Sequence, residues 1–380
     1  MADSGRPRPA ERRPGYPVGR VLGFPLYLNP STLIFAALVT LTYGAFVART
    51  LEFPAATSYA VGFMFVICLL ASVLLHELGH ALTARHFKIG VRGITLELLG
   101  GYTEMERDAP TARIDLLVAL AGPAVSLALG MLSVATVLVL PGGTVVYQLA
   151  FQLALSNLLV AAFNSLPGLP LDGGRALRAA VWALTGDRHR GTEIAGWTGR
   201  AVAVLTAATV LLLYVAQLFS LFGLVFMLLI AVTLWQGASQ AIRVARISRR
   251  LPLVDLAQLA RPLFAVPAGT PLAEAQRRAA EAGRGDAALA VADSAGRLVA
   301  LVHREAADAV PVERRAWVSI DTVARGLDGV SRLPSSLRGE EVVRAVQEHP
   351  GAEYLVTSGD DVIGVLHVAD LALLLEPKGR

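Results

Sequence analysis

Two histidines four residues apart, with a glutamate directly after the first, are the side chains best suited to chemistry in this sequence. They stand in the stretch Leu75 to Ala81, which reads LHELGHA and ends a long apolar run. On a helix, residues i and i+4 lie on one face, so the imidazoles of His76 and His80 can bind one zinc ion. Glu77 would then be a general base that takes a proton from water. Ionisable side chains in an apolar segment are costly, which favours a functional site over a chance match.

A catalytic zinc site needs a third protein ligand and keeps one coordination position open. Asp172, in the stretch NSLPGLPLDGGR that ends at Arg175, is the best candidate. The apolar runs before His76 and before Asp172 are expected to cross the membrane in the same direction, which delivers both ligands at similar depth. The alternative is that Asp172 only caps the helix that follows it. His86 is a poorer ligand, because it lies six residues from His80 and faces another side of the helix.

Asparagine is the other polar residue type near this region that suits catalysis. Asn164 can donate a hydrogen bond to a scissile carbonyl or to its oxyanion. Its alternative role is a hydrogen bond between packed helices. Asn157 lies seven residues earlier on nearly the same helix face and is the competing candidate. Gly122 and Pro123 are expected to permit close helix packing or a kink.

The composition predicts that these residues are positioned by a polytopic α-helical membrane protein. The chain has 380 residues, is 54% hydrophobic and has a mean hydropathy of +0.55, which is too apolar for an ordinary soluble domain. We expect six spans, in the uncharged runs Thr32–Ala48, Ala55–Leu75, Leu116–Leu140, Pro141–Leu171 and, for two spans folded near Gln217–Gly223, Ala201–Ile242. Pro167 and Pro170 mark where the fourth helix stops.

Charge and cysteine content indicate the membrane orientation of the chain and exclude an internal disulfide. The net charge is +4, and basic residues gather in every second loop. By the positive-inside rule these loops are cytoplasmic, so we expect a multi-pass protein of the cell membrane with both termini in the cytoplasm. The pattern does not indicate a nucleic-acid partner. Cys68 is the single cysteine, which excludes an internal disulfide. No signal peptide is evident, and residues 1–20 are expected to form a flexible cytoplasmic tail.

Two segments outside the spans show patterns of their own. Lys88–Arg107 alternates apolar and polar residues around Gly100 and Gly101, which predicts a small β-hairpin at the membrane surface. Val21–Asn29 is expected to be a short strand or an interfacial segment.

Residues 251–380 have the composition of a soluble domain and contain a weak internal repeat. One copy begins near Val266 and the other near Leu333, and each is predicted as turn, helix, strand, turn and strand. A repeat of about 65 residues is too long for a solenoid unit and is typical of a paired α/β module. The expected domains are the tail at 1–20, a membrane domain at 21–250, and the module at 251–380, with copies at about 251–310 and 318–376.

The motif from His76 to His80 and the stretch from Asn164 to Gly174, in this order and at this spacing, resemble the site-2 protease family of intramembrane zinc metalloproteases. The hairpin at Lys88–Arg107 and the Ala121–Pro123 step are also similar to that family. The likeness covers about residues 16–245.

This resemblance implies that His76, His80 and Asp172 bind one zinc ion, that Glu77 activates water and that Asn164 assists the substrate. It also implies regulated intramembrane proteolysis. Members of that family cleave, within the lipid bilayer, the transmembrane helices of single-pass proteins, often anti-sigma factors or other membrane-held regulators.

Residues 251–380 resemble a tandem pair of CBS domains, and the whole chain resembles the CBS-bearing branch of the site-2 proteases. The nucleotide-binding step of CBS domains is a glycine, a short apolar stretch, a serine or threonine, then an aspartate. The second copy keeps Gly364 and Asp370 but has His367 at the hydroxyl position, and the first copy matches none of the three. The resemblance implies an adenine nucleotide with Asp370 as its ribose contact, and it permits a homodimer through the pair.

Two alternatives stay open at this point. One is a non-enzymatic membrane transporter or channel that CBS domains regulate, with the histidine motif as an ion site. Glu77 argues against it, because hydrolysis needs a base at that position and transport does not. The other is a membrane zincin of another family, with a glutamate from a later helix as third ligand.

Overall fold

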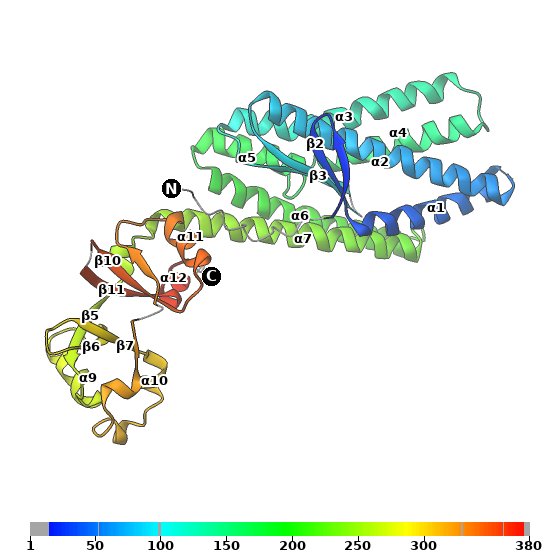
Figure 1. Cartoon of the computed structure of the whole chain (residues 1–380). Coiled ribbons are helices and arrows are strands. Elements are labelled where there is room, and N and C mark those ends of the chain that lie inside the picture. Colours follow the sequence, from blue (N-terminus) through cyan, green and yellow to red (C-terminus); the bar gives the residue numbers. More distant parts are fainter. Residues whose placement is uncertain (1–14, 52, 98–99, 328–329, 360, 376–380) are drawn as a thin grey trace. The chain divides into compact units, whose positions relative to one another are not determined.

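The computed structural model describes residues 15–51, 53–97, 100–327, 330–359 and 361–375. The chain divides into two compact units, Met1–Ala245 and Arg246–Arg380. The first is built mainly from helices, and the second is built around a sheet (Figure 1).

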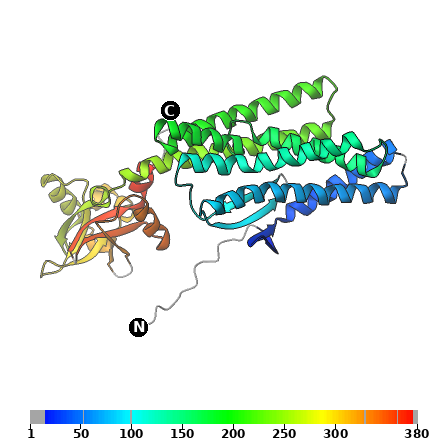
Figure 2. The same cartoon turned by 90° about the horizontal axis from the view of Figure 1, so that it is seen from above.

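Seven helices precede residue 251 in the described part of the chain: α1 (Pro30–Leu51), α2 (Ala55–His86), α3 (Ala112–Val139), α4 (Val145–Asn164), α5 (Asp172–Thr185), α6 (Arg188–Val215) and α7 (Leu221–Arg250). All except α5 are long and apolar enough to cross a membrane, which confirms the expected six apolar helices. The helices of this unit run along a common direction (Figure 2).

Local sequence explains where several of these helices begin and end. The side chains of Thr111, Thr144 and Asp187 each accept a hydrogen bond from the backbone N–H three residues on, at 3.3, 3.2 and 3.0 Å, so they cap α3, α4 and α6. The fourth helix stops as expected, because α4 ends at Asn164 and a non-helical segment with Pro167 and Pro170 leads into α5.

A four-stranded sheet lies beside these helices. Its strands are β1 (Tyr16–Val21), β2 (Phe24–Leu28), β3 (Val91–Glu97) and β4 (Gly100–Met105), in the order β1-β2-β3-β4. The pair β3 and β4 is antiparallel and forms the predicted hairpin. Strand β2 pairs in parallel with β3, so the predicted hairpin is half of a larger sheet.

The expected tail at residues 1–20 is wrong for its last five residues, while residues 1–14 lie outside the described part of the chain. Strand β1 begins at Tyr16, which pairs with Leu28 of β2. The two-residue turn between them has positive φ at Leu22 (51°) and Gly23 (91°), the pattern of a tight hairpin turn. The proline, glycine and arginine in β1 are not typical of a strand, so the sequence did not predict it. The backbone of β1 pairs with that of β2.

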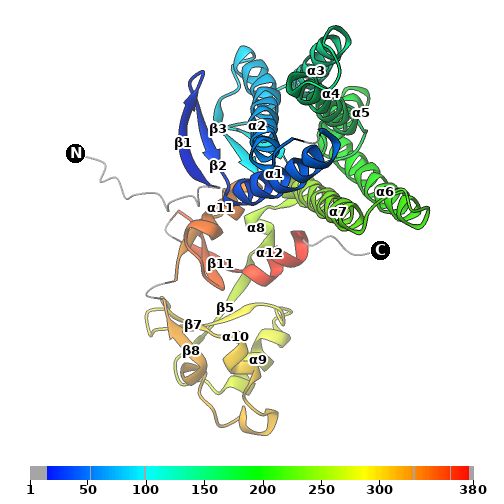
Figure 3. The ribbon, with the colours of Figure 1, turned by 90° about the vertical axis from the view of Figure 1, so that its right-hand side faces the viewer.

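The sheet packs on α2, the helix that carries the histidine motif. Leu78 and Ala81 of α2 are buried against Phe24, Ile94 and Leu96 of the sheet. Each fully buried leucine or isoleucine contributes roughly 1.5–3 kcal/mol. Figure 3 looks along the helices and shows α2 between the sheet and α3.

Helix α5 is tied to α3 by a buried ion pair. Nε and Nη2 of Arg178 donate to the two carboxylate oxygens of Asp115 at 2.9 and 2.6 Å. The side chain of Asp115 is 2% exposed and that of Arg178 is 14% exposed. Because α5 begins at Asp172, this pair fixes a candidate metal ligand relative to α3.

The second unit contains a seven-stranded sheet in the order β8-β7-β6-β5-β11-β10-β9. Its main elements are β5 (Arg261–Pro267), α9 (Leu272–Glu281), β6 (Ala288–Ala292), β7 (Leu298–Val302), α10 (Arg304–Asp308), β8 (Ala324–Gly326), β9 (Arg332–Pro334), α11 (Glu340–Glu348), β10 (Glu353–Ser358), β11 (Asp361–His367) and α12 (Val368–Leu375).

The second unit repeats one order of elements. Strand, helix, strand, strand and helix occur as β5-α9-β6-β7-α10 and again as β9-α11-β10-β11-α12. In both copies the first two strands are parallel and the next pair is antiparallel. The copies join where β5 pairs with β11, and each has its own buried apolar cluster.

We predict that Asp115→Ala lowers the free energy of unfolding by about 3–5 kcal/mol, because it leaves the guanidinium of Arg178 buried without its carboxylate. Denaturant unfolding of the detergent-solubilised protein measures this loss. Asp108→Ala is the matched control, since Asp108 pairs with Arg188 but its side chain is 73% exposed; that loss should stay below about 1 kcal/mol. Equal losses would contradict the structural role of the buried pair.

Candidate metal centre

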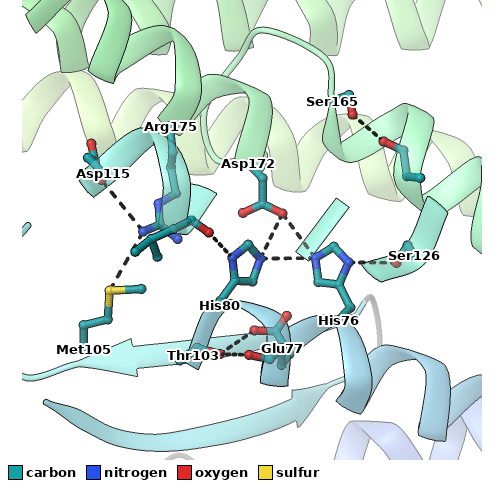
Figure 4. Close-up of polar contacts among 12 residues, drawn as sticks. His76, Glu77, His80, Thr103, Met105, Asp115, Ser126, Ser165, Asp172 and Arg175 are labelled. Atoms are coloured by element: carbon teal, nitrogen blue, oxygen red, sulfur yellow. Dashed lines mark hydrogen bonds and ion pairs between the residues drawn. The ribbon is translucent and has the colours of Figure 1, made fainter. Parts of the chain in front are cut away.

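Three side chains with metal-binding atoms converge between α2 and α5 (Figure 4). The Nε2 atoms of His76 and His80 lie 3.3 Å apart, and each lies 3.2 Å from Oδ2 of Asp172. The three residues are 5%, 3% and 9% exposed. The structure therefore brings together the three ligands that the sequence predicted, although Asp172 lies 92 residues after His80 in the sequence.

The size of this triangle fits a zinc ion. Zinc lies about 2.0–2.2 Å from imidazole nitrogen and carboxylate oxygen, so a tetrahedral site separates neighbouring donors by roughly 3.3–3.5 Å. The three donor separations of 3.2–3.3 Å are close to that spacing. Two imidazoles and one carboxylate also leave a fourth position open, as catalytic zinc sites do. In the described residues, His86 belongs to no such group.

Helix α3 orients both imidazoles through their other nitrogens. Nδ1 of His80 donates to the carbonyl of Val118 at 2.7 Å, and Nδ1 of His76 lies 2.9 Å from Oγ of Ser126. A carbonyl only accepts, so the proton of neutral His80 is on Nδ1 and the lone pair of Nε2 faces the other ligands. Such contacts fix the ring orientation of metal-binding histidines. Motif spacing gave no signal for Ser126 or Val118.

Gly122 allows α3 to pass directly behind the histidines. A Cβ atom at this position would lie 2.2 Å from Nε2 of His80 and 2.6 Å from Nε2 of His76. The expected close helix packing at Gly122 is therefore a contact with the metal-binding atoms themselves.

Asp172 is the first residue of α5 and does not cap it. The cap position is Leu171, which offers no side-chain hydrogen bond, and the carboxylate of Asp172 faces the histidines instead. The capping alternative is therefore wrong. The glycines that follow serve close packing, since a Cβ on Gly174 would lie 2.2 Å from backbone atoms of Gly168 and Leu169.

Glu77 is buried beside the metal ligands and is held by the sheet. It is 5% exposed, and its Oε2 accepts a hydrogen bond from Oγ1 of Thr103 on β4 at 2.7 Å (Figure 4). A carboxylate next to a metal centre can take a proton from a water molecule and return it. The sequence predicted Glu77 but gave no sign of Thr103.

A cavity of about 420 Å³ contains these groups. Its polar wall includes His76, Glu77, His80 and Asp172. Its apolar wall comes from α1, α2, α4 and α7 and consists of Phe35, Leu69, Leu70, Val73, Val160, Phe226 and Ile230. The cavity therefore offers hydrolytic groups beside a surface that suits an apolar chain.

The two asparagines occupy different surroundings. Asn164 is half-buried and lines the cavity, and within the described residues its side chain has no hydrogen-bond partner. Asn157 is 3% exposed, and its Nδ2 donates to Oγ of Ser72 at 3.2 Å and to the carbonyl of Leu153 at 2.9 Å. Asn157 therefore makes the hydrogen bond between packed helices, while Asn164 lines the cavity.

Asp370, the predicted ribose contact, lies in the first turn of α12 and is engaged in an ion pair. Both of its carboxylate oxygens accept hydrogen bonds from Arg261, each at 2.7 Å, and this contact lowers the pKa of Asp370. A cavity of about 240 Å³ is lined by Arg261 and His367, and Asp370 is not among its lining residues. A ribose contact at Asp370 stays a prediction.

Two histidines from one helix, a carboxylate from another and a glutamate after the first histidine define a zinc metallopeptidase centre among apolar helices. Known proteins agree with this class. The model of Peptidase family M50 matches residues 64–154. The "Putative zinc metalloprotease Rip3" of Mycobacterium tuberculosis is 33% identical over 377 residues, which cover 96% of this chain and 93% of that protein. The chain belongs to Peptidase family M50, the site-2 proteases.

Two further relatives match part of the chain. The "Putative zinc metalloprotease sll0528" of Synechocystis is 42% identical over 194 residues, so the match spans half of each protein. A solved site-2 protease from Methanocaldococcus jannaschii is 26% identical, with a TM-score of 0.43, over 60% of this chain and 94% of that one. The family assignment sets aside the transporter or channel and the zincin of another family.

We predict that the purified protein carries about one zinc per chain and that Asp172→Ala and Gly122→Ala both lose it, with affinity lowered tenfold or more. The first change removes a ligand, and the second places a methyl group against both Nε2 atoms. Elemental analysis after dialysis measures the content. Gly142→Ala is the matched control, because a Cβ there meets nothing within 4 Å. Full zinc occupancy in Gly122→Ala would contradict the packing argument.

Proposed function

We propose that this chain is a zinc-dependent intramembrane endopeptidase that cleaves transmembrane segments of single-pass, membrane-anchored regulators, of which anti-sigma factors are one class. The observation that carries the proposal is the placement of Glu77 and the three metal-binding side chains in one cavity with an apolar opposite wall. Membership of the M50 family supports the same reaction.

The residues divide the chemistry among them. Zinc held by His76, His80 and Asp172 would supply a Lewis acid and lower the pKa of water. Glu77 takes the proton of the attacking water and delivers it to the leaving amine. Asn164 donates its amide N–H to the oxygen of the scissile carbonyl as negative charge develops there. The apolar wall holds the flanking side chains and limits access of bulk water.

Strand β4 offers the substrate a place to bind. It is an edge of the sheet, and within the described residues no strand pairs with its outer side. Gly100, Gly101, Tyr102 and Thr103 line the cavity, so this edge runs beside the metal ligands. A transmembrane helix protects its peptide bonds with its own hydrogen bonds, so it must unwind locally before cleavage. The unwound segment would add to β4 as a further strand.

The distribution of basic residues indicates how the chain is oriented in a membrane. We propose a multi-pass protein of the cell membrane with cytoplasmic termini and with the metal ligands toward the cytoplasmic leaflet. The basic residues in every second loop support this orientation. We propose that the proteolytic domain extends to about residue 250 and that 251–380 form a regulatory CBS pair through which two chains can associate. The repeated order of elements in the second unit supports a pair.

We predict that Glu77→Gln keeps its zinc and loses about 100-fold or more of the turnover, because the amide keeps the shape but cannot accept the proton. The assay uses the full chain in detergent and a synthetic peptide with a leucine-alanine segment of about 20 residues. The segment is interrupted by Asn-Pro to weaken its helix and carries a fluorophore and a quencher. Cleavage by Glu77→Gln at the wild-type rate would remove the proposed mechanism.

Asn164→Ala should lower turnover of the same peptide about tenfold or more without loss of zinc, because a donor to the developing oxyanion is removed. Asn157→Ala is the matched control. It removes a contact between helices, so its turnover should change less. The reverse ranking would mean that Asn157 is the residue that meets the substrate.

We also propose that an adenine nucleotide binds the second unit with Asp370 as its ribose contact. Ribose hydroxyls must then compete with Arg261 for the carboxylate, so Asp370→Ala should weaken binding about tenfold or more if Asp370 takes part. Calorimetric titration of the full chain with ATP, ADP, AMP and S-adenosylmethionine tests this, with exposed Asp361→Ala as control. No heat with any of the four would leave dimerisation as the role of the pair.

A further inference from the structure

Thr103 makes the contact that holds the carboxylate of Glu77. Its Oγ1 lies 2.7 Å from Oε2 of Glu77 and 3.1 Å from the backbone carbonyl of the same residue. Both acceptors belong to the turn of α2 that carries the histidine motif, and the donor belongs to β4. The hydroxyl therefore links a strand of the sheet to the base beside the metal centre (Figure 4).

The surrounding strand is shaped for this contact. Alternate residues of a strand face the same side, so Gly101 and Thr103 both face α2. A Cβ on Gly101 would lie 2.9 Å from Cγ of Glu77. Gly101 thus leaves room for the stem of the glutamate, and Thr103 binds its end. Tyr102, between them, faces away and is partly exposed.

The contact selects one carboxylate oxygen. In the described part of the chain, Oε2 of Glu77 has this hydrogen bond and Oε1 has none. A glutamate has three side-chain torsions, and an unrestrained carboxylate would populate several orientations. With Oε2 held, Oε1 is the oxygen left to accept a proton in the cavity.

We propose that Thr103 is the positioning residue of the general base and that it couples substrate binding to the alignment of Glu77. This rests on the proposed proteolytic function. The backbone of Thr103 belongs to the edge strand that would pair with an unwound substrate, while its side chain holds the base. A substrate that pairs with β4 fixes this backbone and so fixes the carboxylate. A segment that enters the cavity without pairing meets a less ordered base.

The test compares two substitutions at one position in the full chain, with the fluorogenic transmembrane peptide as probe. Thr103→Val removes the hydroxyl and keeps the shape. It should lower kcat about tenfold or more, with KM within about twofold and zinc retained. Thr103→Ser keeps the hydroxyl and should hold kcat within about threefold of wild type. Thr95→Val is the matched control in the same sheet, because Thr95 pairs with Tyr102 and faces away from Glu77.

The outcomes separate this inference from the proteolytic function. Loss in Thr103→Val with rescue in Thr103→Ser supports it. Wild-type kcat in Thr103→Val, equal losses in both variants, or a raised KM with unchanged kcat would each overturn it and leave the proteolytic function intact. Equal turnover by the wild type and Glu77→Gln would instead contradict the proposed proteolytic function, and the positioning role of Thr103 would fail with it.

Discussion

The close approach of α3 to α2 is the constraint on which the rest of the structure depends. Where the two helices meet, Gly122 brings the backbone of α3 against the metal-binding nitrogens, and Val118 and Ser126 hold the opposite nitrogens of the same rings. A larger residue at Gly122 would separate the helices and break both contacts. The metal centre is therefore shaped as much by backbone proximity as by the identity of its ligands.

Two sets of contacts outside the metal centre hold the other residues of the site in place relative to α2 and α3. The pair between Asp115 and Arg178 holds α5 on α3, so that Asp172 faces the histidines. The sheet packs on the other side of α2 and brings Thr103 to Glu77. Burying charged groups is costly unless they are paired, which explains why each of these polar side chains has a defined partner.

Sequence predicted the parts of this protein that local periodicity and motif spacing control. Six apolar helices, the hairpin of β3 and β4, and convergence of Asp172 with the two histidines could all be inferred from runs, turns and the motif. Strand β1 could not, because its proline, glycine and arginine resemble a tail until pairing with β2 is known. The contacts of Thr103 and Arg261 could not be predicted either, because tertiary packing rather than a sequence motif determines their partners.

The parallel pairing of β2 with β3 has a consequence for how the chain is built. Leu26 pairs with Ile94, and the whole of α1 and α2 lies between them in the sequence. A strand before α1 and a strand after α2 can share one sheet only when the two helices form an antiparallel pair that returns the chain to its starting side. During synthesis, β2 cannot pair with β3 until both helices have been made. Because β3 precedes Asp172 in the sequence, this sheet can close before the third metal ligand has been synthesised.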